Sequence, residues 1–161
     1  MVLMYTINIP GNSNEYDYVL SILNLLNNGF REYTFINCTE SPLDEFEYIE
    51  YNGIYYRELG TLETNKNKRC QVNEQDYMNS YEGDHLKEDG FTLKEYIDMC
   101  FLFELDRIEI IPKCQGDQFQ PGNIDSDHVA TILICPDGWN EIQIHANEEV
   151  LSKLIAPLSK N

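Results

Sequence analysis

A chain of 161 residues is the usual length of one domain, and it carries 28 Asp and Glu against 11 Lys and Arg, a formal net charge of −17. Phosphate backbones and anionic membrane surfaces repel such a chain, so we expect neither nucleic acid nor a membrane to bind it directly. The charge favours a basic protein as the partner, although solubility alone would also explain it.

The cysteines and the N-terminus indicate a cytoplasmic protein. Five cysteines, odd in number and without a CxxC pair, predict free thiols in a reducing compartment: Cys38, Cys70, Cys100, Cys114 and Cys135. The first residues, MVLMYTINIPG, have no basic segment before a short alternating apolar run, which predicts a strand rather than a signal peptide. No stretch approaches the roughly 20 apolar residues of a membrane span.

The first third of the chain predicts a strand, a helix and a second strand. Leu3, Tyr5, Ile7 and Ile9 alternate onto one face of the first strand, which Pro10-Gly11 ends. A helix follows over about residues 13–28, with an N-cap among residues 12–14 and a glycine at position 29 that we expect to act as a left-handed cap. Residues 31–38 are typical of the next strand.

Residues 46–59 predict a β-hairpin. Asn52-Gly53 between two alternating runs is the strongest short hairpin signal, because a type I′ turn needs positive φ at both central residues. The turn fixes the register, in which Ile49 opposes Tyr56 and Glu47 opposes Glu58. Two opposed carboxylates destabilise a hairpin mildly unless a basic group lies near them.

Residues 61–90 look the least ordered. A short strand over 69–72 is compatible with the pattern, and residues 73–90 are acidic without a hydrophobic period, which predicts a long surface loop. The helix over about residues 92–105 follows, with Thr92 and Glu95 as a capping box. We expect its polar strip, which includes Asp98, to face solvent, and its apolar stretch 99–103 to be covered on nearly every side.

The last third completes an α+β domain. Residues 107–111 alternate as a strand, and residues 114–127 predict a polar loop. The apolar run 128–135 predicts an interior strand, and residues 140–146 predict a strand with one inward apolar face. Asn147 would cap a helix over about residues 147–156. Residues 1–161 therefore predict a single α+β domain, a mostly antiparallel β-sheet with three helices.

No catalytic, cofactor-binding or metal-binding motif appears. The seven serines include no GxSxG, and the glycines form no phosphate-binding loop. Asp125, Asp127 and His128 are the nearest approach to a zinc cluster, and a solvated turn accounts for them better. The acidic residues 74–89 lack the spacing of an EF-hand. We expect no metal and no cofactor.

The partner-binding hypothesis rests on acidic residues interleaved with tyrosines. Tyrosine is enriched at interfaces, and neighbouring carboxylates can take Arg side chains in bidentate geometry. The alternative is that the tyrosines pack under their neighbours and the acids are merely solvated. The candidate partner-binding residues are Glu45, Glu47, Glu50, Tyr51 and Tyr55 in the hairpin, and Asp76, Tyr77, Tyr81, Glu82, Asp84, Glu88 and Asp89 in the acidic segment.

In its general profile the chain is similar to bacterial immunity proteins that neutralise nuclease toxins, and to phage-encoded inhibitors of host defence. That resemblance covers composition only, and it implies an acidic inhibitor that binds a basic toxin or nuclease without catalysis. Two alternatives stay open. One is a small hydrolase, with or without a metal, whose site assembles from separated residues. The other is a subunit of a larger assembly.

Overall fold

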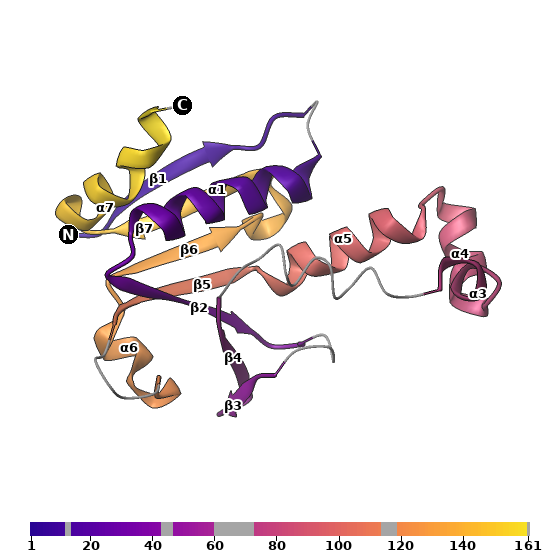
Figure 1. Ribbon diagram of the computed structural model, residues 1–161, viewed down its shortest axis with the longest axis horizontal. Helices are drawn as coiled ribbons and strands as arrows, with labels where there is room; N and C mark the ends of the chain where they lie inside the picture. The colour runs from indigo at the N-terminus through magenta and orange to yellow at the C-terminus, as the bar shows by residue number, and fades with distance from the viewer. Residues whose placement is uncertain (12–13, 43–46, 60–72, 114–118, 161) are drawn as a thin grey trace.

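The computed structural model describes residues 1–11, 14–42, 47–59, 73–113 and 119–160. The strands of this part of the chain form one antiparallel sheet of seven, in the order β1-β7-β6-β5-β2-β4-β3 (Figure 1). They are β1 (Leu3–Asn8), β2 (Tyr33–Thr39), β3 (Ile49–Tyr51), β4 (Ile54–Glu58), β5 (Arg107–Pro112), β6 (Ala130–Ile134) and β7 (Glu141–Ala146).

The predicted α+β class and the antiparallel sheet are confirmed, and so are all three predicted helices. The expected helix count is wrong, because the described residues hold six α-helices and three 3₁₀ helices. They are α1 (Glu15–Gly29), α3 (Glu74–Met78), α4 (Tyr81–Asp89), α5 (Leu93–Glu104), α6 (Ile124–Asp127), α7 (Glu148–Ile155), η1 (Pro121–Asn123), η2 (Pro136–Gly138) and η3 (Ala156–Lys160).

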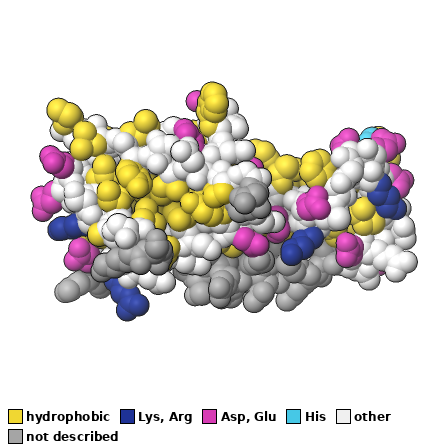
Figure 2. All heavy atoms as spheres, turned by 90° about the horizontal axis from the view of Figure 1, so that it is seen from above, with side chains coloured by type: hydrophobic (Ala, Val, Ile, Leu, Met, Phe, Trp, Pro, Cys, Tyr) yellow, Lys and Arg dark blue, Asp and Glu magenta, His cyan; other side chains and the backbone are white. Residues whose placement is uncertain are grey.

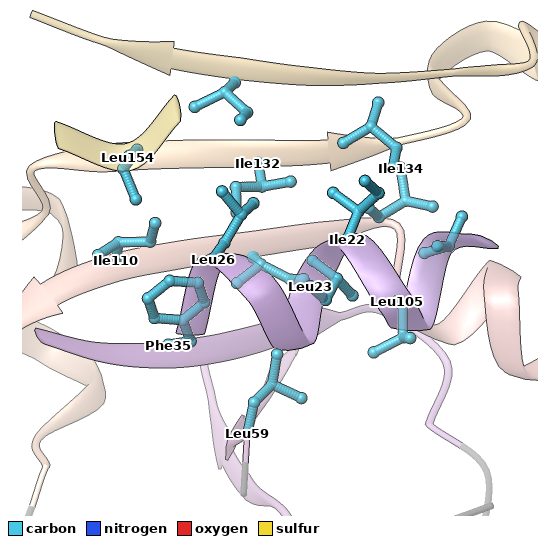
Figure 3. Close-up of a cluster of buried hydrophobic side chains, with 14 of the residues drawn as sticks. Ile22, Leu23, Leu26, Phe35, Leu59, Leu105, Ile110, Ile132, Ile134 and Leu154 are labelled. Carbon is cyan, nitrogen blue, oxygen red and sulfur yellow. The ribbon is translucent and has the colours of Figure 1, made fainter. Parts of the chain in front are cut away.

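The main hydrophobic core lies between α1 and one face of the sheet. In Figure 3, Ile22, Leu23 and Leu26 of α1 point at the strands, and Leu154 of α7 joins them. Each such side chain, when fully buried, stabilises the fold by about 1.5–3 kcal/mol. The strand residues on this face include Phe35, Ile108, Ile110, Ile132, Ile134, Ile142 and Ile144, all buried.

Helix α1 begins and ends close to the predicted residues, but the glycine at its end is not the left-handed cap that was expected. Asn14 caps the helix, with its side-chain oxygen accepting a hydrogen bond from the Asp17 N–H at 3.0 Å. Gly29 is the last residue of the helix and is not among the left-handed glycines. A Cβ at position 29 would lie 2.5 Å from Cγ of Pro157, so the close approach of η3 requires this glycine.

The opposite face of the sheet is covered only over part of its width. A second cluster, with α6 on it, consists of Ile36, Cys38, Tyr56, Ile111 and Ile124. On the same face of β6, β7 and β1 no side chain is buried. The predicted outward residues of β7 form a chain there, in which Gln143 donates to Glu141 at 2.7 Å and His145 lies 3.1 Å from Gln143. This is the solvated face of an antiparallel sheet.

Helix α5 begins as predicted but is buried differently. The Thr92 hydroxyl accepts a hydrogen bond from the Glu95 N–H at 3.2 Å, which confirms the N-cap. Asp98 was expected in solvent and is buried, whereas Phe103 was expected under cover and is 71% exposed. Helix α5 extends from the sheet and carries α3 and α4 at its N-terminal end (Figure 1), whereas Phe103 lies in its last turn, close to β5, on a side that the described residues leave open.

Two predicted loops are partly helical. Residues 73–90 form α3 and α4 instead of a long loop, and residues 121–127 form η1 and α6. The short strand predicted over 69–72 lies outside the described residues. The three described cysteines are free thiols, of which Cys38 is buried and Cys100 and Cys135 are half-buried.

Candidate functional site: an acidic hairpin pocket and an acidic helical tip

The β3–β4 hairpin has the predicted turn and register. Asn52 and Gly53 both adopt positive φ, at 52° and 80°, as a type I′ turn requires. Ile49 pairs with Tyr56, and Glu50 pairs with Tyr55. The carboxylate of Glu50 also accepts a hydrogen bond from the Gly53 N–H at 3.0 Å, so this candidate residue helps to hold the turn.

A pocket of about 410 Å³ is lined by residues 47–49 and 56–58 of the hairpin and by Phe119. Its apolar wall consists of Ile49, Tyr56 and Phe119, and the rings of Tyr56 and Phe119 lie 6.1 Å apart. Continuing the Ile49–Tyr56 register by two residues places Glu47 opposite Glu58, and both are exposed lining residues. We call these five residues, with Tyr48 and Arg57, the hairpin pocket.

Arg57, the cationic residue of the hairpin pocket, already interacts with Tyr48 and Glu104. The guanidinium of Arg57 lies 5.1 Å from the centre of the Tyr48 ring and 3.8 Å from the carboxylate of Glu104. The side chains of Arg57 and Glu104 are 9% and 1% exposed, so this is a buried ion pair. No ion pair to Glu47 or Glu58 is formed by the part of the chain that is described. Glu47 and Glu58 therefore have no cationic partner among the described residues.

The hairpin candidates have different environments. Glu47 and Tyr51 are exposed, and Tyr55 is half-buried on the other face of the sheet, edge-to-face with Tyr48 at 6.4 Å. Glu45 lies outside the described residues. The pocket adds Tyr48, Tyr56, Glu58 and Phe119, which were not among the candidates. The predicted Glu47–Glu58 opposition pointed to Glu58, but Phe119 sits in a stretch with no local signal.

Helices α3 and α4 hold the second group of candidates, which we call the acidic tip: Asp76, Tyr77, Tyr81, Glu82, Asp84, Glu88 and Asp89. The N-caps of the two helices are Asn73, which accepts from the Asp76 N–H at 3.1 Å, and Ser80, which accepts from the Gly83 N–H at 3.3 Å. Gly90 ends α4 in the left-handed conformation, with φ of 80°. Both helices contact α5, but between them they bury only Gly83, which lies against α3, and Leu86.

Some side chains of the acidic tip are engaged with one another. The Tyr77 hydroxyl donates to Glu82 at 3.0 Å, and partial burial together with this carboxylate raises the pKa of Tyr77 to about 12. Tyr81 is 79% exposed, with its ring edge-to-face to His85 at 4.5 Å. His85 in turn lies 3.9 Å from Glu88. Tyr81 is therefore a large aromatic side chain held out in solvent among carboxylates.

The structure does not bring the two groups of candidates into one surface. The hairpin lies at one edge of the sheet, and the acidic tip lies at the far end of α5 (Figure 1). Figure 2 shows acidic side chains gathered around the tip end of the molecule, with a few basic ones among them. A partner could contact both surfaces only if it spanned the length of α5.

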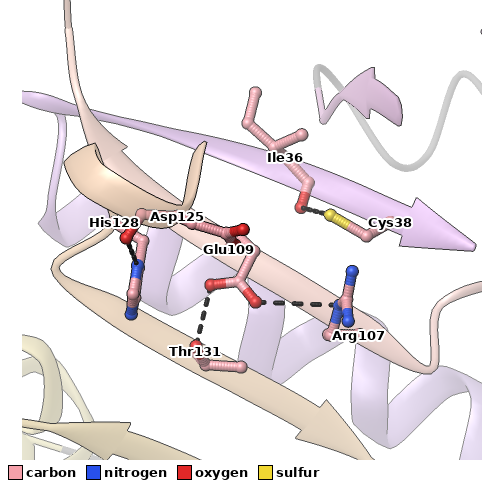
Figure 4. A network of polar contacts seen from close by, with 7 residues as sticks. All are labelled: Ile36, Cys38, Arg107, Glu109, Asp125, His128 and Thr131. Carbon is pink, nitrogen blue, oxygen red and sulfur yellow. Dashed lines mark hydrogen bonds and ion pairs between the residues drawn. The ribbon is translucent and has the colours of Figure 1, made fainter. Parts of the chain in front are cut away.

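A third polar cluster lies on the face of the sheet opposite α1 (Figure 4). The carboxylate of Glu109 accepts a hydrogen bond from the Thr131 hydroxyl at 2.8 Å and lies 3.7 Å from the Arg107 guanidinium. Burial raises the pKa of Glu109, while Thr131 and Arg107 oppose the shift. Burial also raises the pKa of the nearby Cys38 thiol to about 11, so it is not an activated nucleophile at neutral pH.

The same cluster contains His128, and the ring of His128 interacts with the backbone of α6. The Nδ1 of His128 lies 2.9 Å from the carbonyl oxygen of Asp125, three residues earlier in the chain. Within the described ranges, no three His, Cys, Asp or Glu side chains are grouped as metal ligands would be. Glu109 is hydrogen-bonded to Thr131 and ion-paired to Arg107, whereas the Nε of Arg107 is buried without a hydrogen-bond partner among the described residues.

Comparison with known proteins gives no relative from which a role could be carried over. No family profile, no curated protein and no solved structure matches this chain. None of the helices in the described residues has the length and apolar character needed to cross a membrane.

Proposed function

We propose that this protein binds a basic protein and neutralises it, as an inhibitor of the immunity or antitoxin kind, without catalysing a reaction. The observation that carries the proposal is the hairpin pocket, which combines the aromatic wall of Tyr56 and Phe119 with the exposed carboxylates of Glu47 and Glu58, and neither carboxylate forms an ion pair with a described residue. An Arg or Lys side chain fits such a site, because aromatic rings attract its charge and its stem while the carboxylates accept its hydrogen bonds.

The net charge of −17 supports the same proposal at longer range. The field of such a molecule draws a cationic partner in and raises the association rate. The acidic tip adds exposed carboxylates and the exposed ring of Tyr81 at a second place. Aromatic and charged anchors of this kind usually dominate the affinity of an interface of about 1,600 Å².

Neutralisation follows from competition for the same groups. A nuclease or another nucleic-acid-binding toxin holds phosphates with Lys and Arg side chains. A carboxylate pocket that binds one of those Lys or Arg side chains prevents it from binding a phosphate. The rest of the inhibitor would block access of the nucleic acid to the surface of the toxin. No residue of the inhibitor needs to react.

The experiment compares three tagged baits in extracts of the cell that makes the protein. The baits are the wild type, the double variant Glu47→Lys/Glu58→Lys, and a control of equal charge change, Glu32→Lys/Glu148→Lys, on exposed residues outside both acidic surfaces. We expect the wild type and the control to retain one stoichiometric polypeptide of high pI, and the pocket variant to lose it. Thermal unfolding of all three baits checks that they are folded.

Two results would count against the proposal. In one, the pocket variant retains the same basic polypeptide as the wild type, which would remove the pocket from the interface. In the other, the wild type retains no basic polypeptide at all, which would remove charge complementarity as the principle of binding.

A further inference from the structure

Strand β1 lies at an edge of the sheet, and no described strand pairs with its outer side. Among the described residues it pairs only with β7, in the register that sets Leu3 opposite Ala146 and Asn8 opposite Glu141. The Ile9 N–H donates to the Asn140 carbonyl at 3.0 Å, next in that register. Because hydrogen-bonded pairs alternate in an antiparallel ladder, the backbone groups of Met4, Thr6 and Asn8 point away from the sheet.

Within β1 itself, as far as the structure describes its surroundings, the features that usually prevent pairing are missing. Sheet edges are protected by short strands, charged side chains, prolines or bulges. The other edge strand, β3, has three residues, contains Glu50 and contacts η1. β1 has six residues, none of them charged or proline, and Met4 on it is 57% exposed. Figure 2 looks down on the side where β1, α7 and α1 lie, and hydrophobic side chains spread across it.

The charge distribution identifies the occupant of this edge. Residues 1–14 contain no Asp, Glu, Lys, Arg or His, although the whole chain has a net charge of −17. Two copies of so acidic a protein repel each other wherever carboxylates would meet. The β1 edge is a place where they can meet without opposing charged side chains on the paired strands.

We propose that β1 pairs antiparallel with β1 of a second copy, joining the two sheets across a two-fold axis. The register that uses all three outward residues places Thr6 opposite the same residue of the copy and Met4 opposite Asn8. Tyr5 then lies opposite Ile7 on the face where Leu3 and Ile7 pack against the core. Aromatic and β-branched residues stabilise a sheet when they are paired in this way.

The two-fold geometry also separates the carboxylates that lie beside the start of β1. Glu148 and Glu149 lie beside Met1 and Leu3, around a pocket of about 520 Å³. Because Leu3 lies opposite Ile9 of the copy, the two Leu3 residues are six residues apart along the strands, about 20 Å. That exceeds the Debye length of about 8 Å at physiological salt, so the two α7 N-termini barely repel each other.

Sedimentation equilibrium of the full chain over a range of concentration tests the proposal. We expect the wild type to reach twice the 18.8 kDa of one chain, and dimerisation to strengthen as salt screens the net charge. Thr6→Pro removes an outward N–H that the fold does not use, and should weaken dimerisation by about tenfold or more. Tyr5→Pro is the contrasting variant. It removes an N–H that hydrogen-bonds to β7, so it should disrupt the pairing of β1 with β7 within one chain.

Met4→Glu is a second variant for the dimerisation test, to be used if Thr6→Pro is poorly folded. Its side chain is exposed, so the monomer should keep the wild-type thermal unfolding while dimerisation weakens. Amide exchange gives the second readout: the Met4, Thr6 and Asn8 amides should become protected only as concentration rises. A wild type that stays monomeric at all concentrations overturns the proposal, and so does dimerisation that Thr6→Pro and Met4→Glu leave unchanged. Protection of the same amides by a different protein would assign the edge to that protein instead.

Discussion

Glu109 is the residue whose ionisation should be most visible in the stability of this protein. It is buried on β5, accepts a hydrogen bond from Thr131, and burial raises its pKa above the ordinary 4.5. A carboxyl whose pKa is raised by folding favours the fold in its protonated form. That contribution is complete below the unfolded-state pKa and is lost as the pH rises through the folded-state pKa.

Glu109→Gln should therefore change the pH dependence of stability. Glutamine resembles the protonated carboxyl, so the free energy of unfolding of the variant, minus that of the wild type, should increase from acid to neutral pH. Chemical unfolding at a series of pH values measures this difference. A difference that stays constant over the series would show that folding leaves the pKa of Glu109 unshifted, and one that decreases with pH would show that folding lowers it; either result contradicts the prediction.

Thr131→Val is the companion variant. The Thr131 hydroxyl donates to the Glu109 carboxylate at 2.8 Å and so favours the ionised form. Its removal should destabilise the protein by about 1–3 kcal/mol at neutral pH, and by less in acid. In a Glu109→Gln background this pH dependence should disappear.

At the scale of elements, the short helices α3 and α4 depend on one close backbone approach. A Cβ at Gly83 would overlap the carbonyl oxygen of Tyr77 and lie 2.5 Å from Cα of Met78. Both are backbone atoms, which cannot move aside as the end of a flexible side chain could. The geometry of the acidic tip therefore depends on the absence of a side chain at position 83.

Gly83→Ala should separate α4 from α3 while leaving the sheet intact. We expect a local cost of about 1–3 kcal/mol, the usual range for overpacking. Hydrogen exchange measures it residue by residue: the amides of α3 and α4 should exchange faster, and those of β5 and β6 should not change. Gly11→Ala is the matched control, since no atom lies within 4 Å of a Cβ there. Unchanged exchange in α3 and α4 would contradict this packing.

The sequence predicts the elements that carry strong local signals. The caps at Asn14, Thr92 and Asn147 each accept the expected backbone hydrogen bond, because an N-cap is decided within four residues. The Asn52-Gly53 turn likewise sets the hairpin register by itself. The helices α3 and α4 give no hydrophobic period, because between them they bury only Gly83 and Leu86.

The candidate site could be predicted only in part, because its parts meet through the fold. Glu47 and Glu58 are opposed by the hairpin itself, which the sequence predicts. Phe119 reaches Tyr56 only because η1 and α6 fold back on the second cluster, and no local pattern predicts that. Burial of Asp98 and exposure of Phe103 were also unpredictable from the helical pattern, since they depend on which sides of α5 the rest of the fold covers.

At the scale of the whole molecule, the charge is unevenly placed. The N-terminal 14 residues have no charged side chain, whereas the hairpin pocket and the acidic tip carry exposed carboxylates. Such a distribution separates two kinds of contact: a neutral edge that suits a second copy, and acidic surfaces that suit a basic partner. The two contacts use opposite edges of the sheet, β1 and β3, so one need not exclude the other.

The central claim is that charge at the hairpin pocket attracts a basic partner. The measurement that tests it most directly is the association rate of the complex as a function of salt, for the wild type and Glu47→Lys/Glu58→Lys. We expect the wild-type rate to fall by about tenfold or more from low to high salt with little change in dissociation, and the variant to associate slowly at low salt already. An association rate independent of salt, or equal for the two proteins, would contradict the claim.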